Sequence, residues 1–226
     1  MQKVDFDLYS NEYNTIMEKA HEKYGDISYY SSHKVNITKK IFHNSHCKIL
    51  EYGCGVGRNL NDLKNAYPDS SVYGFDISEE SLAIAQKQNP EITLLLEKNI
   101  KNYSNYFDII FIAGVYHHIH PSIRNEVTEN IRNLLKVGGG MICFEHNPYN
   151  PLTRHMVSTC AFDDDAILLT KSESELHFLS HQLVKIQAGY TLFFPPKLSY
   201  FSWLEKYISW IPLGGQYFVA FKKSTD

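Results

Sequence analysis

The 226-residue sequence predicts an α/β fold in which helices cover both faces of a mostly parallel sheet. Three observations lead to this prediction. Five short apolar runs recur between residues 47 and 146, helical patterns separate them, and a glycine-rich stretch directly follows the first run. Alternating strands and helices build parallel sheets, and such sheets bind their ligands at the carboxyl ends of the strands.

The elements follow in order along the chain. Helices are expected at 11–24 and 33–45, before a first strand, "CKILEYG". "SSVYGFDIS" predicts the second strand, "EESLAIAQKQ" the helix after it, "ITLLLEK" the third strand and "YFDIIFIAG" the fourth. A helix is expected over 121–136, because Pro121 suits a first turn and "KVGGG" is typical of a helix C-terminus. "MICFEH" predicts the fifth strand.

The alternation ends after residue 147. A segment punctuated by proline runs to about residue 172, a helix is expected near 173–188, and "GYTLFFPP" and "QYFVAFKK" predict two late strands. Between those strands, one stripe of the aromatic-rich insert carries Phe201, Leu204, Ile208 and Ile211, and a second carries Trp203, Tyr207 and Trp210. We expect this insert to pack in the core, with pocket lining as the alternative.

Composition excludes several classes of protein. Lysine and arginine total 22 against 25 acidic residues, so no basic excess is present to bind a nucleic acid. The first residues lack the pattern of a signal peptide, and no apolar run approaches membrane-spanning length, so a cytoplasmic protein is expected. The four cysteines are scattered, which indicates neither a zinc site nor a disulfide framework.

The strongest motif is "LEYGCGVGRNL", which follows the first strand. Glu51 precedes the alternating glycines Gly53, Gly55 and Gly57, which let a backbone turn tightly and approach a ligand closely. Nineteen positions after Gly57, Asp76 ends the second strand, where a carboxylate can accept hydrogen bonds from both ribose hydroxyls. Together these residues predict a ligand that carries a nucleoside. Their alternative roles are a ligand-free turn and a helix N-cap.

The third glycine decides which nucleoside ligand is expected. A dinucleotide fingerprint would need glycine at position 58, where this chain has Arg58, so a nicotinamide oxidoreductase is disfavoured. Over roughly residues 33–145 the E-x-G-x-G-x-G pattern and the elements after it resemble the class I S-adenosylmethionine-dependent methyltransferases. The resemblance implies a Rossmann-like, seven-stranded, mostly parallel sheet with an antiparallel last strand. It also implies S-adenosyl-L-methionine as cofactor and S-adenosyl-L-homocysteine as product.

The resemblance also implies a cofactor site, residue by residue. Gly53 and Gly55 would pass under the methionine moiety, Glu51 would hydrogen-bond its amino end, and Asp76 would hold the ribose. Relatives often carry an acidic residue near the adenine amino group after the third strand, and this chain's candidate is Asn99. The remaining expected cofactor contacts are Ile77, Ile100 and the backbone of Ala113.

Histidines follow the fourth and fifth strands, where the acceptor of the methyl group would lie. A histidine suits proton acceptance near neutral pH, so we interpret His118, and after it His117 and His146, as candidate catalytic bases. Such histidines also pack or cap loops without any catalytic role. His120, directly before a proline, is assigned to a helix start.

The segment "EHNPYNPLTRH" leaves the fifth strand beside the expected cofactor. Glu145, Asn147, Asn150 and Arg154 are its candidate acceptor-binding residues. Asn150 is expected to cap a short helix whose first residue is Pro151. Arg154 would then bind a carboxylate or phosphate, or form an ion pair with one residue of the aspartate run 163–165. That run is interpreted as a helix cap, and no metal is assigned.

The sequence therefore predicts a single domain over residues 1–226, with N-terminal helices and a lid at 1–46, a cofactor-binding half at 47–146, and an acceptor-side segment at 147–226. The expected activity is methyl transfer to a small polar or anionic molecule at oxygen. The alternatives are an N-methyltransferase of a small molecule or macromolecule and a non-catalytic S-adenosylmethionine-binding protein. We expect a small-molecule acceptor, no nucleic acid and no stable membrane insertion, and the sequence leaves open whether the chain forms a homodimer.

Overall fold

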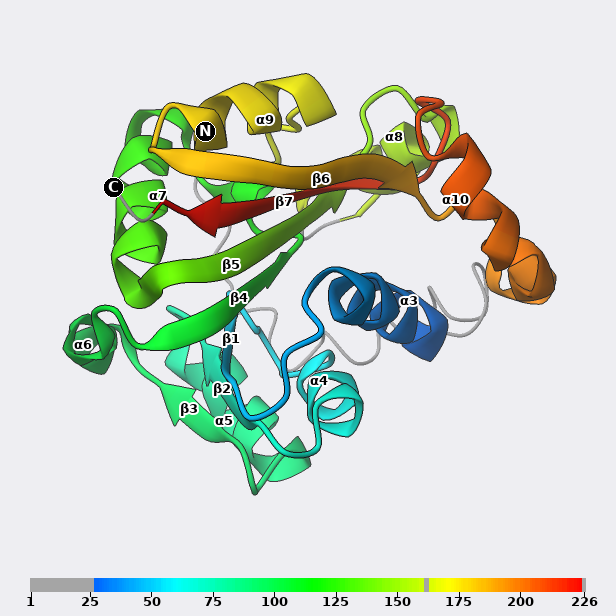
Figure 1. Cartoon of the computed structure of the whole chain (residues 1–226). Coiled ribbons are helices and arrows are strands. Elements are labelled where there is room, and N and C mark those ends of the chain that lie inside the picture. Colours follow the sequence, from blue (N-terminus) through cyan, green and yellow to red (C-terminus); the bar gives the residue numbers. More distant parts are fainter. Residues whose placement is uncertain (1–26, 161–162, 225–226) are drawn as a thin grey trace.

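The computed structural model describes residues 27–160 and 163–224, so the helix expected at 11–24 lies outside the described residues. A seven-stranded sheet with the order β3-β2-β1-β4-β5-β7-β6 forms the centre of the molecule (Figure 1). β7 runs in the opposite direction to the other six strands of this sheet, which confirms the predicted Rossmann-like fold. The strands are β1 Lys48–Tyr52, β2 Ser71–Phe75, β3 Thr93–Leu95, β4 Phe107–Ala113, β5 Leu135–His146, β6 Leu183–Thr191 and β7 Gln216–Lys223.

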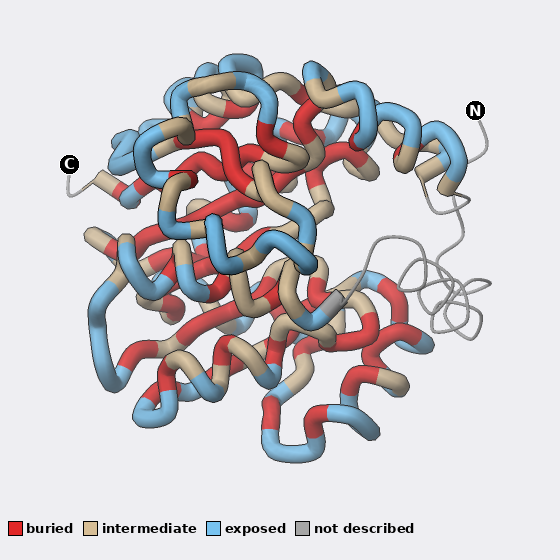
Figure 2. The backbone as a smooth tube through the Cα atoms, turned by 90° about the vertical axis from the view of Figure 1, so that its right-hand side faces the viewer, coloured by how far each residue is buried: buried red, intermediate tan, exposed pale blue. Residues whose placement is uncertain are grey.

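Helices flank the sheet, and two separate apolar clusters lie against its two faces. Side chains alternate across the pleat, so Ile109 and Phe111 of β4 enter one cluster while Ile110 and Ile112 enter the other. The buried backbone accordingly runs through the middle of the molecule, between exposed outer segments (Figure 2). The α-helices are α3 Ile27–Ile41, α4 Leu60–Ala66, α5 Glu79–Gln88, α6 Glu97–Ile100, α7 Arg124–Leu134, α8 Pro151–Ser158, α9 Lys171–Leu179 and α10 Glu205–Ile208.

The prediction that "KVGGG" ends a helix is wrong. Helix α7 ends at Leu134, and β5 begins at the next residue, so these glycines belong to the strand. The pairing of β4 with β5 shifts register between Phe107 and Ile109. A Cβ on Gly140 would lie 2.2 Å from the Phe42 ring, so the glycine is needed there for packing rather than for helix termination.

The helix expected at 173–188 is also too long. Helix α9 ends at Leu179, and residues from Leu183 onward form β6, which pairs with β7 along its length. The helix begins where a capping box forms: Thr170 accepts from the Glu173 amide, and the Glu173 side chain accepts from the Thr170 amide. The apolar residues in "LVKIQAG" fit a helical period as well as a strand, so local pattern alone did not separate the two elements.

The aromatic insert does not pack in the core as predicted. It folds as a 3₁₀ helix, η5 Pro196–Leu204, followed by α10. Trp203, Tyr207 and Trp210 are 61, 61 and 76% exposed, and Phe201 is also exposed. None of these four aromatic side chains lines the large cavity described below.

The sequence predicted that the chain does not insert stably into a membrane. Among the described residues, no helix combines the length and the apolar character needed to cross a membrane.

Candidate functional site

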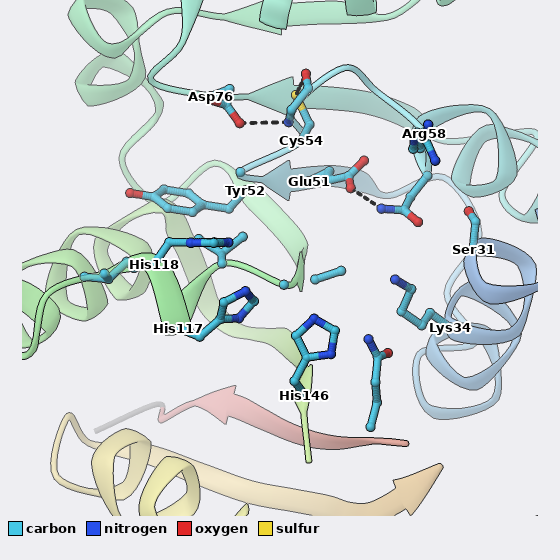
Figure 3. Close-up of a pocket in the computed structure, with 18 of the residues that line it drawn as sticks. Ser31, Lys34, Glu51, Tyr52, Cys54, Arg58, Asp76, His117, His118 and His146 are labelled. Carbon is cyan, nitrogen blue, oxygen red and sulfur yellow. Dashed lines mark hydrogen bonds between the residues drawn. The ribbon is translucent and has the colours of Figure 1, made fainter. Parts of the chain in front are cut away.

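A cavity of about 1960 Å³ opens at the carboxyl ends of β1, β2, β4 and β5. Ligand pockets typically enclose about 300–1000 Å³, so this one has room for two ligands side by side. Its wall contains the glycine loop after β1, the end of β2, the loop after β4 and the end of β5. Figure 3 shows the imidazoles of His117, His118 and His146 across the cavity from the Asp76 and Glu51 side.

The three glycines after β1 all have left-handed backbone geometry, with φ of +76° at Gly53, +51° at Gly55 and +81° at Gly57. A Cβ at Gly53 would lie 2.5 Å from a Val115 methyl carbon, and one at Gly57 would lie 2.7 Å from the Asn89 amide nitrogen. A Cβ at Gly55 would meet nothing within 4 Å. Two of the glycines are therefore required by the protein itself, whereas Gly55 leaves space that a ligand can enter.

Asp76 is held beside this loop by two backbone donors. The amide of Gly55 donates to one carboxylate oxygen at 2.7 Å, and the amide of Ser78 donates to the other at 3.0 Å. The N-cap of α5 is Ser78, whose hydroxyl accepts from the Ser81 amide at 3.0 Å. Asp76 is therefore not the N-cap of this helix, and its carboxylate lines the cavity at the position expected for a ribose ligand.

Glu51 lies buried at the end of β1 and is only partly satisfied. The Asn59 side-chain amide donates to one carboxylate oxygen at 2.6 Å, while the other oxygen has no hydrogen-bond partner among the described residues. Burial raises the pKa of Glu51 to about 8, against the opposing effects of the Asn59 hydrogen bond and the Lys34 charge. A carboxylate with a free, buried oxygen at a cavity wall is suited to receive a ligand ammonium group.

The adenine side differs from the expectation at one residue. Ile77, Ile100 and Ala113 line the cavity, whereas Asn99 is exposed and does not. Strand β3 ends at Leu95, earlier than predicted, and Glu97 lines the cavity instead of Asn99. An acidic residue, Glu97, therefore does follow the third strand. Asn99 was predicted instead because the end of that strand was placed three residues too late.

His117 is almost fully buried and engaged at both ring nitrogens. Nδ1 lies 2.5 Å from a Glu145 carboxylate oxygen, and Nε2 lies 3.4 Å from Asp163. Burial alone would lower the pKa of His117, but the two carboxylates outweigh it and raise that pKa to about 9. The other Glu145 oxygen accepts from the amides of Val115 and Tyr116. Glu145 therefore fixes the loop after β4 and His117, and it is not among the cavity-lining residues.

His118 and His146 lie on either side of His117, with ring centroids 4.1 and 5.0 Å from its own. His118 contacts Asp165 through Nδ1 at 3.2 Å and Asp163 through Nε2 at 3.5 Å. Burial and the His117 charge lower the pKa of His118 and bring that of His146 to about 4. His146 also lines the cavity, and its buried Nδ1 atom has no hydrogen-bond partner within the described residues.

Asn147 has a structural position rather than an acceptor-binding one. Its side-chain amide donates to the carbonyls of Pro212 at 3.1 Å and Gly214 at 2.7 Å, and its oxygen accepts from the Tyr149 amide. Asn147 is fully buried and does not line the cavity. It joins the end of β5 to the turn that precedes β7.

Asn150 is the N-cap of α8, as expected, with Pro151 at the first helical position. Its oxygen accepts from two backbone amides of the first turn, and its nitrogen donates to the Leu213 carbonyl at 2.7 Å. Asn150 lines the cavity, but Arg154 does not. Arg154 is exposed and makes no ion pair within the described residues, so the structure removes the support for an anionic acceptor.

The aspartate run does not cap α9, the next α-helix along the chain. Helix α9 begins at Lys171 and is capped by Thr170, whereas Asp163 and Asp165 turn toward the histidines and line the cavity. No local sequence signal brings them there, because α8 separates them from the loop after β4. Lys34 of α3 also lines the cavity and lies near Glu51 (Figure 3).

Comparison with known proteins shows what this sequence and this fold are similar to. The sequence of residues 49–139 matches a family model described as a methyltransferase domain. The matched region, which is less than half of the chain, resembles methyltransferase domains, and the whole fold is similar to that of S-adenosylmethionine-dependent methyltransferases of known structure. A possible histamine N-methyltransferase from Thermotoga maritima, a solved structure, is 17% identical, with a TM-score of 0.71 over 97% of this chain and 98% of that chain. That likeness concerns the fold.

Two relatives with known sequences match this chain over shorter stretches. An uncharacterized methyltransferase of Bacillus cytotoxicus is 25% identical over 61% of this chain and 63% of its own length. A malonyl-[acyl-carrier protein] O-methyltransferase of Bacillus anthracis is 23% identical over 51% of this chain and 43% of its own length. The match thus spans less than two thirds of either relative, so their substrates do not transfer to this chain.

Proposed function

We propose that the protein transfers the methyl group of S-adenosylmethionine to an oxygen atom of a small polar acceptor. The supporting observation is the division of the cavity into two differently lined sides. One side is formed by the glycine loop after β1 together with Glu51 and Asp76. The other side is formed by the histidine and aspartate side chains that lie beyond the ends of β4 and β5. The volume of about 1960 Å³ accommodates a cofactor and a second molecule together.

The cofactor side supplies a partner for each polar part of S-adenosylmethionine. Asp76 would accept hydrogen bonds from the ribose hydroxyls, and the free oxygen of Glu51 would accept from the ammonium group. Gly55 would allow close approach of the methionine part, because no side chain fills the space beside it. Glu97 would accept from the adenine amino group.

The acceptor side determines the geometry of transfer. An acceptor oxygen attacks the methyl carbon in line, the carbon–sulfur bond breaks, and its electron pair stays on sulfur to give S-adenosylhomocysteine. The acceptor proton needs a base, and His146 offers an Nδ1 atom that has no hydrogen-bond partner among the described residues. His117 and His118 are held by carboxylates, so we assign them a positioning role and place His146 at the acceptor.

Transfer to nitrogen is the second candidate. Asp163 and Asp165 place two carboxylates at the acceptor side, which would also suit a cationic amine. A small-molecule panel with methyl-labelled S-adenosylmethionine distinguishes the two outcomes. Hydroxyl and carboxylate acceptors form one arm and amines the other, with the product analysed by mass spectrometry and S-adenosylhomocysteine release measured in parallel. Label found only on amines, or only on protein or nucleic acid, overturns the oxygen assignment.

A further inference from the structure

Three side chains on the acceptor side converge on one point. The Nε2 atoms of His117 and His118 lie 3.4 and 3.5 Å from the same Asp163 carboxylate oxygen. The three candidate ligand atoms all lie within 4.8 Å of one another. The histidines belong to the 3₁₀ helix after β4, η2 Tyr116–His118, and the aspartate to the segment after α8. Two parts of the chain far apart in sequence therefore supply this cluster.

Each histidine is oriented by a second carboxylate on the opposite side of its ring. Glu145 contacts Nδ1 of His117 at 2.5 Å, and Asp165 contacts Nδ1 of His118 at 3.2 Å. Histidines that ligate metals usually donate the other ring N–H to a carboxylate or carbonyl, which fixes the tautomer and the ring orientation. The same arrangement here directs both Nε2 atoms toward Asp163.

The spacing of the cluster fits a metal ion. With ligand bonds of about 2.1 Å and a tetrahedral angle, two ligand atoms on one ion lie about 3.4 Å apart. The observed separations of 3.4 and 3.5 Å from Asp163 to the two imidazoles match that edge. Little rearrangement would be needed for an ion to enter between these atoms.

Backbone contacts hold the two segments together without any ion. The Ile167 amide donates to the His117 carbonyl at 2.8 Å. Arg124 then donates to the carbonyls of Ile119 and Ile167, at 2.9 Å each. These bonds fix the segment that carries Asp163 and Asp165 against the loop after β4, so the cluster is preorganised.

The charge around the cluster favours a cation. Three carboxylates, those of Glu145, Asp163 and Asp165, surround two imidazoles at the cavity wall. Two imidazole nitrogens and one carboxylate suit zinc, iron, cobalt, nickel or manganese, whereas magnesium and calcium prefer oxygen ligands throughout. We propose that His117, His118 and Asp163 form a three-ligand site for a divalent first-row transition-metal ion.

The site has a consequence that rests on the proposed function. All three ligands line the cavity, so the remaining coordination positions would face the acceptor. A divalent ion polarises a bound hydroxyl and lowers its pKa, which helps the oxygen attack the methyl carbon while the proton passes to His146 or water. The acceptors favoured by such a site carry two neighbouring oxygen donors, such as vicinal hydroxyls or a hydroxyl beside a carboxylate.

Cobalt absorption spectroscopy tests the site without any acceptor. Tag-free protein stripped with a chelator is titrated with Co²⁺, and bound metal is counted by elemental analysis. We expect one ion per chain, with visible absorption bands typical of nitrogen and oxygen ligation, displaced by Zn²⁺. His118→Ala and Asp163→Asn should weaken binding by more than about 100-fold, and Asp165→Asn by about 10–100-fold, because Asp165 acts only through His118.

His43→Gln is the matched control, because His43 is an exposed histidine before β1 and outside the cavity. It should bind Co²⁺ as the wild type does. S-adenosylmethionine affinity, measured on the same metal-free samples, should be unchanged in every variant and also reports correct folding. Equal Co²⁺ affinity in all five proteins, or no saturation of the wild type, overturns the metal site. If the wild-type protein does not bind S-adenosylmethionine, the proposed function is overturned instead.

Discussion

The backbone amide of Gly55 donates a hydrogen bond to the Asp76 carboxylate at 2.7 Å, which joins the loop after β1 to the end of β2. This bond orients the carboxylate before any ligand arrives, so the two motifs act as one preorganised unit. The Ser78 amide satisfies the second carboxylate oxygen. A carboxylate oxygen can accept more than one hydrogen bond, so a ribose hydroxyl can bind Asp76 alongside these backbone donors.

Asp76→Ala should weaken S-adenosylmethionine binding by about 10–100-fold, since hydrogen bonds to a charged group contribute about 1.5–3 kcal/mol. The affinity of Asp76→Asn should lie between the affinities of the wild type and Asp76→Ala, because the asparagine side-chain oxygen still accepts one hydrogen bond from the backbone. Isothermal titration calorimetry measures both affinities, and circular dichroism checks that the fold is retained. Equal affinity in wild type and Asp76→Ala would remove Asp76 from the site.

Gly53→Ala should mainly lose folding stability, whereas Gly55→Ala should mainly lose ligand binding. Alanine at 53 meets a Val115 methyl at 2.5 Å, so the folded state itself should lose about 2–4 kcal/mol through this clash and the left-handed backbone. Alanine at 55 meets nothing within 4 Å, so its folding cost should stay near about 1–2 kcal/mol. Chemical denaturation compares the two variants, and calorimetry compares their ligand binding.

The double variant Gly53→Ala/Val115→Ala provides the control for that comparison. It should recover part of the lost stability, because removing the Val115 methyls relieves the clash. Gly55→Ala should instead keep most of its stability and lose S-adenosylmethionine affinity. Unimpaired binding in folded Gly55→Ala would show that no ligand enters this space.

The sequence was sufficient to predict the sheet, the glycine loop and Asp76. These depend on short-range signals: a strand end, glycines at fixed spacing, and a carboxylate at the next strand end. The N-cap at Asn150 was predicted for the same reason, because asparagine before proline has a strong local preference at a helix start. The error at "KVGGG" arose because the tertiary contact with Phe42, and no local rule, requires the glycine.

The acceptor side was predicted less well, since its residues meet only in three dimensions. Asp163 and Asp165 lie more than forty positions after His118, and no spacing rule links a loop after α8 to one after β4. Arg154 was assigned to the cavity from chain position alone, but the turn of α8 directs it elsewhere. The direction in which a helical side chain points depends on its position around the helix axis. If the start of the helix is misplaced by one residue, that direction changes by about 100°.

Affinity for S-adenosylmethionine should increase with pH through Glu51. Because burial raises the Glu51 pKa to about 8, the ligand-free carboxyl is mostly protonated at pH 6. Binding the ligand ammonium requires the carboxylate, so a proton is released and affinity should rise by up to about tenfold per pH unit below the pKa. Calorimetry between about pH 6 and pH 7.5, in buffers of different ionisation enthalpy, measures both the affinity and the released proton.

Glu51→Gln is the control for this pH dependence, since it keeps the shape and the contact with Asn59 but cannot release a proton. Its affinity should be lower than that of the wild type at pH 7.5 and nearly independent of pH. A wild-type affinity that stays flat over the same range would contradict the assignment of Glu51 to the ammonium group.

His146 and Arg154 should respond differently to substitution by glutamine. His146 lines the cavity, and its Nδ1 atom has no partner among the described residues, so His146→Gln should reduce kcat by about 10²–10⁴-fold, the usual contribution of a positioned acid or base. Arg154 is exposed and outside the cavity, so Arg154→Gln should leave kcat and KM within about twofold, as is usual for surface changes. Steady-state kinetics with the acceptor found in the labelled panel measures both. A tenfold rise in KM for Arg154→Gln would restore the anionic acceptor.

Glu205 should control acid stability through the insert that precedes β7. Its carboxylate accepts from the amides of Leu192 and Phe193 and from the Thr191 hydroxyl, and lies 3.2 Å from His33. Burial opposes ionisation, but the His33 contact and these donors outweigh it, so the Glu205 pKa falls below its usual value. The stabilisation is therefore present above the unfolded-state pKa and is lost as pH decreases through the folded-state pKa.

Glu205→Gln should lower the free energy of unfolding by about 1.5–3 kcal/mol near neutral pH, because a charged acceptor of several donors is replaced by a neutral one. The difference from wild type should shrink as pH falls below the unfolded-state glutamate pKa of about 4.3, because the unfolded chain then takes up a proton that the folded chain does not yet bind. Since Leu192 and Phe193 line the cavity, acceptor KM should rise in the same variant while S-adenosylmethionine affinity stays unchanged. Urea denaturation across pH measures the first effect. A constant stability difference down to pH 3 would show that the charge of Glu205 is not what holds this strand end.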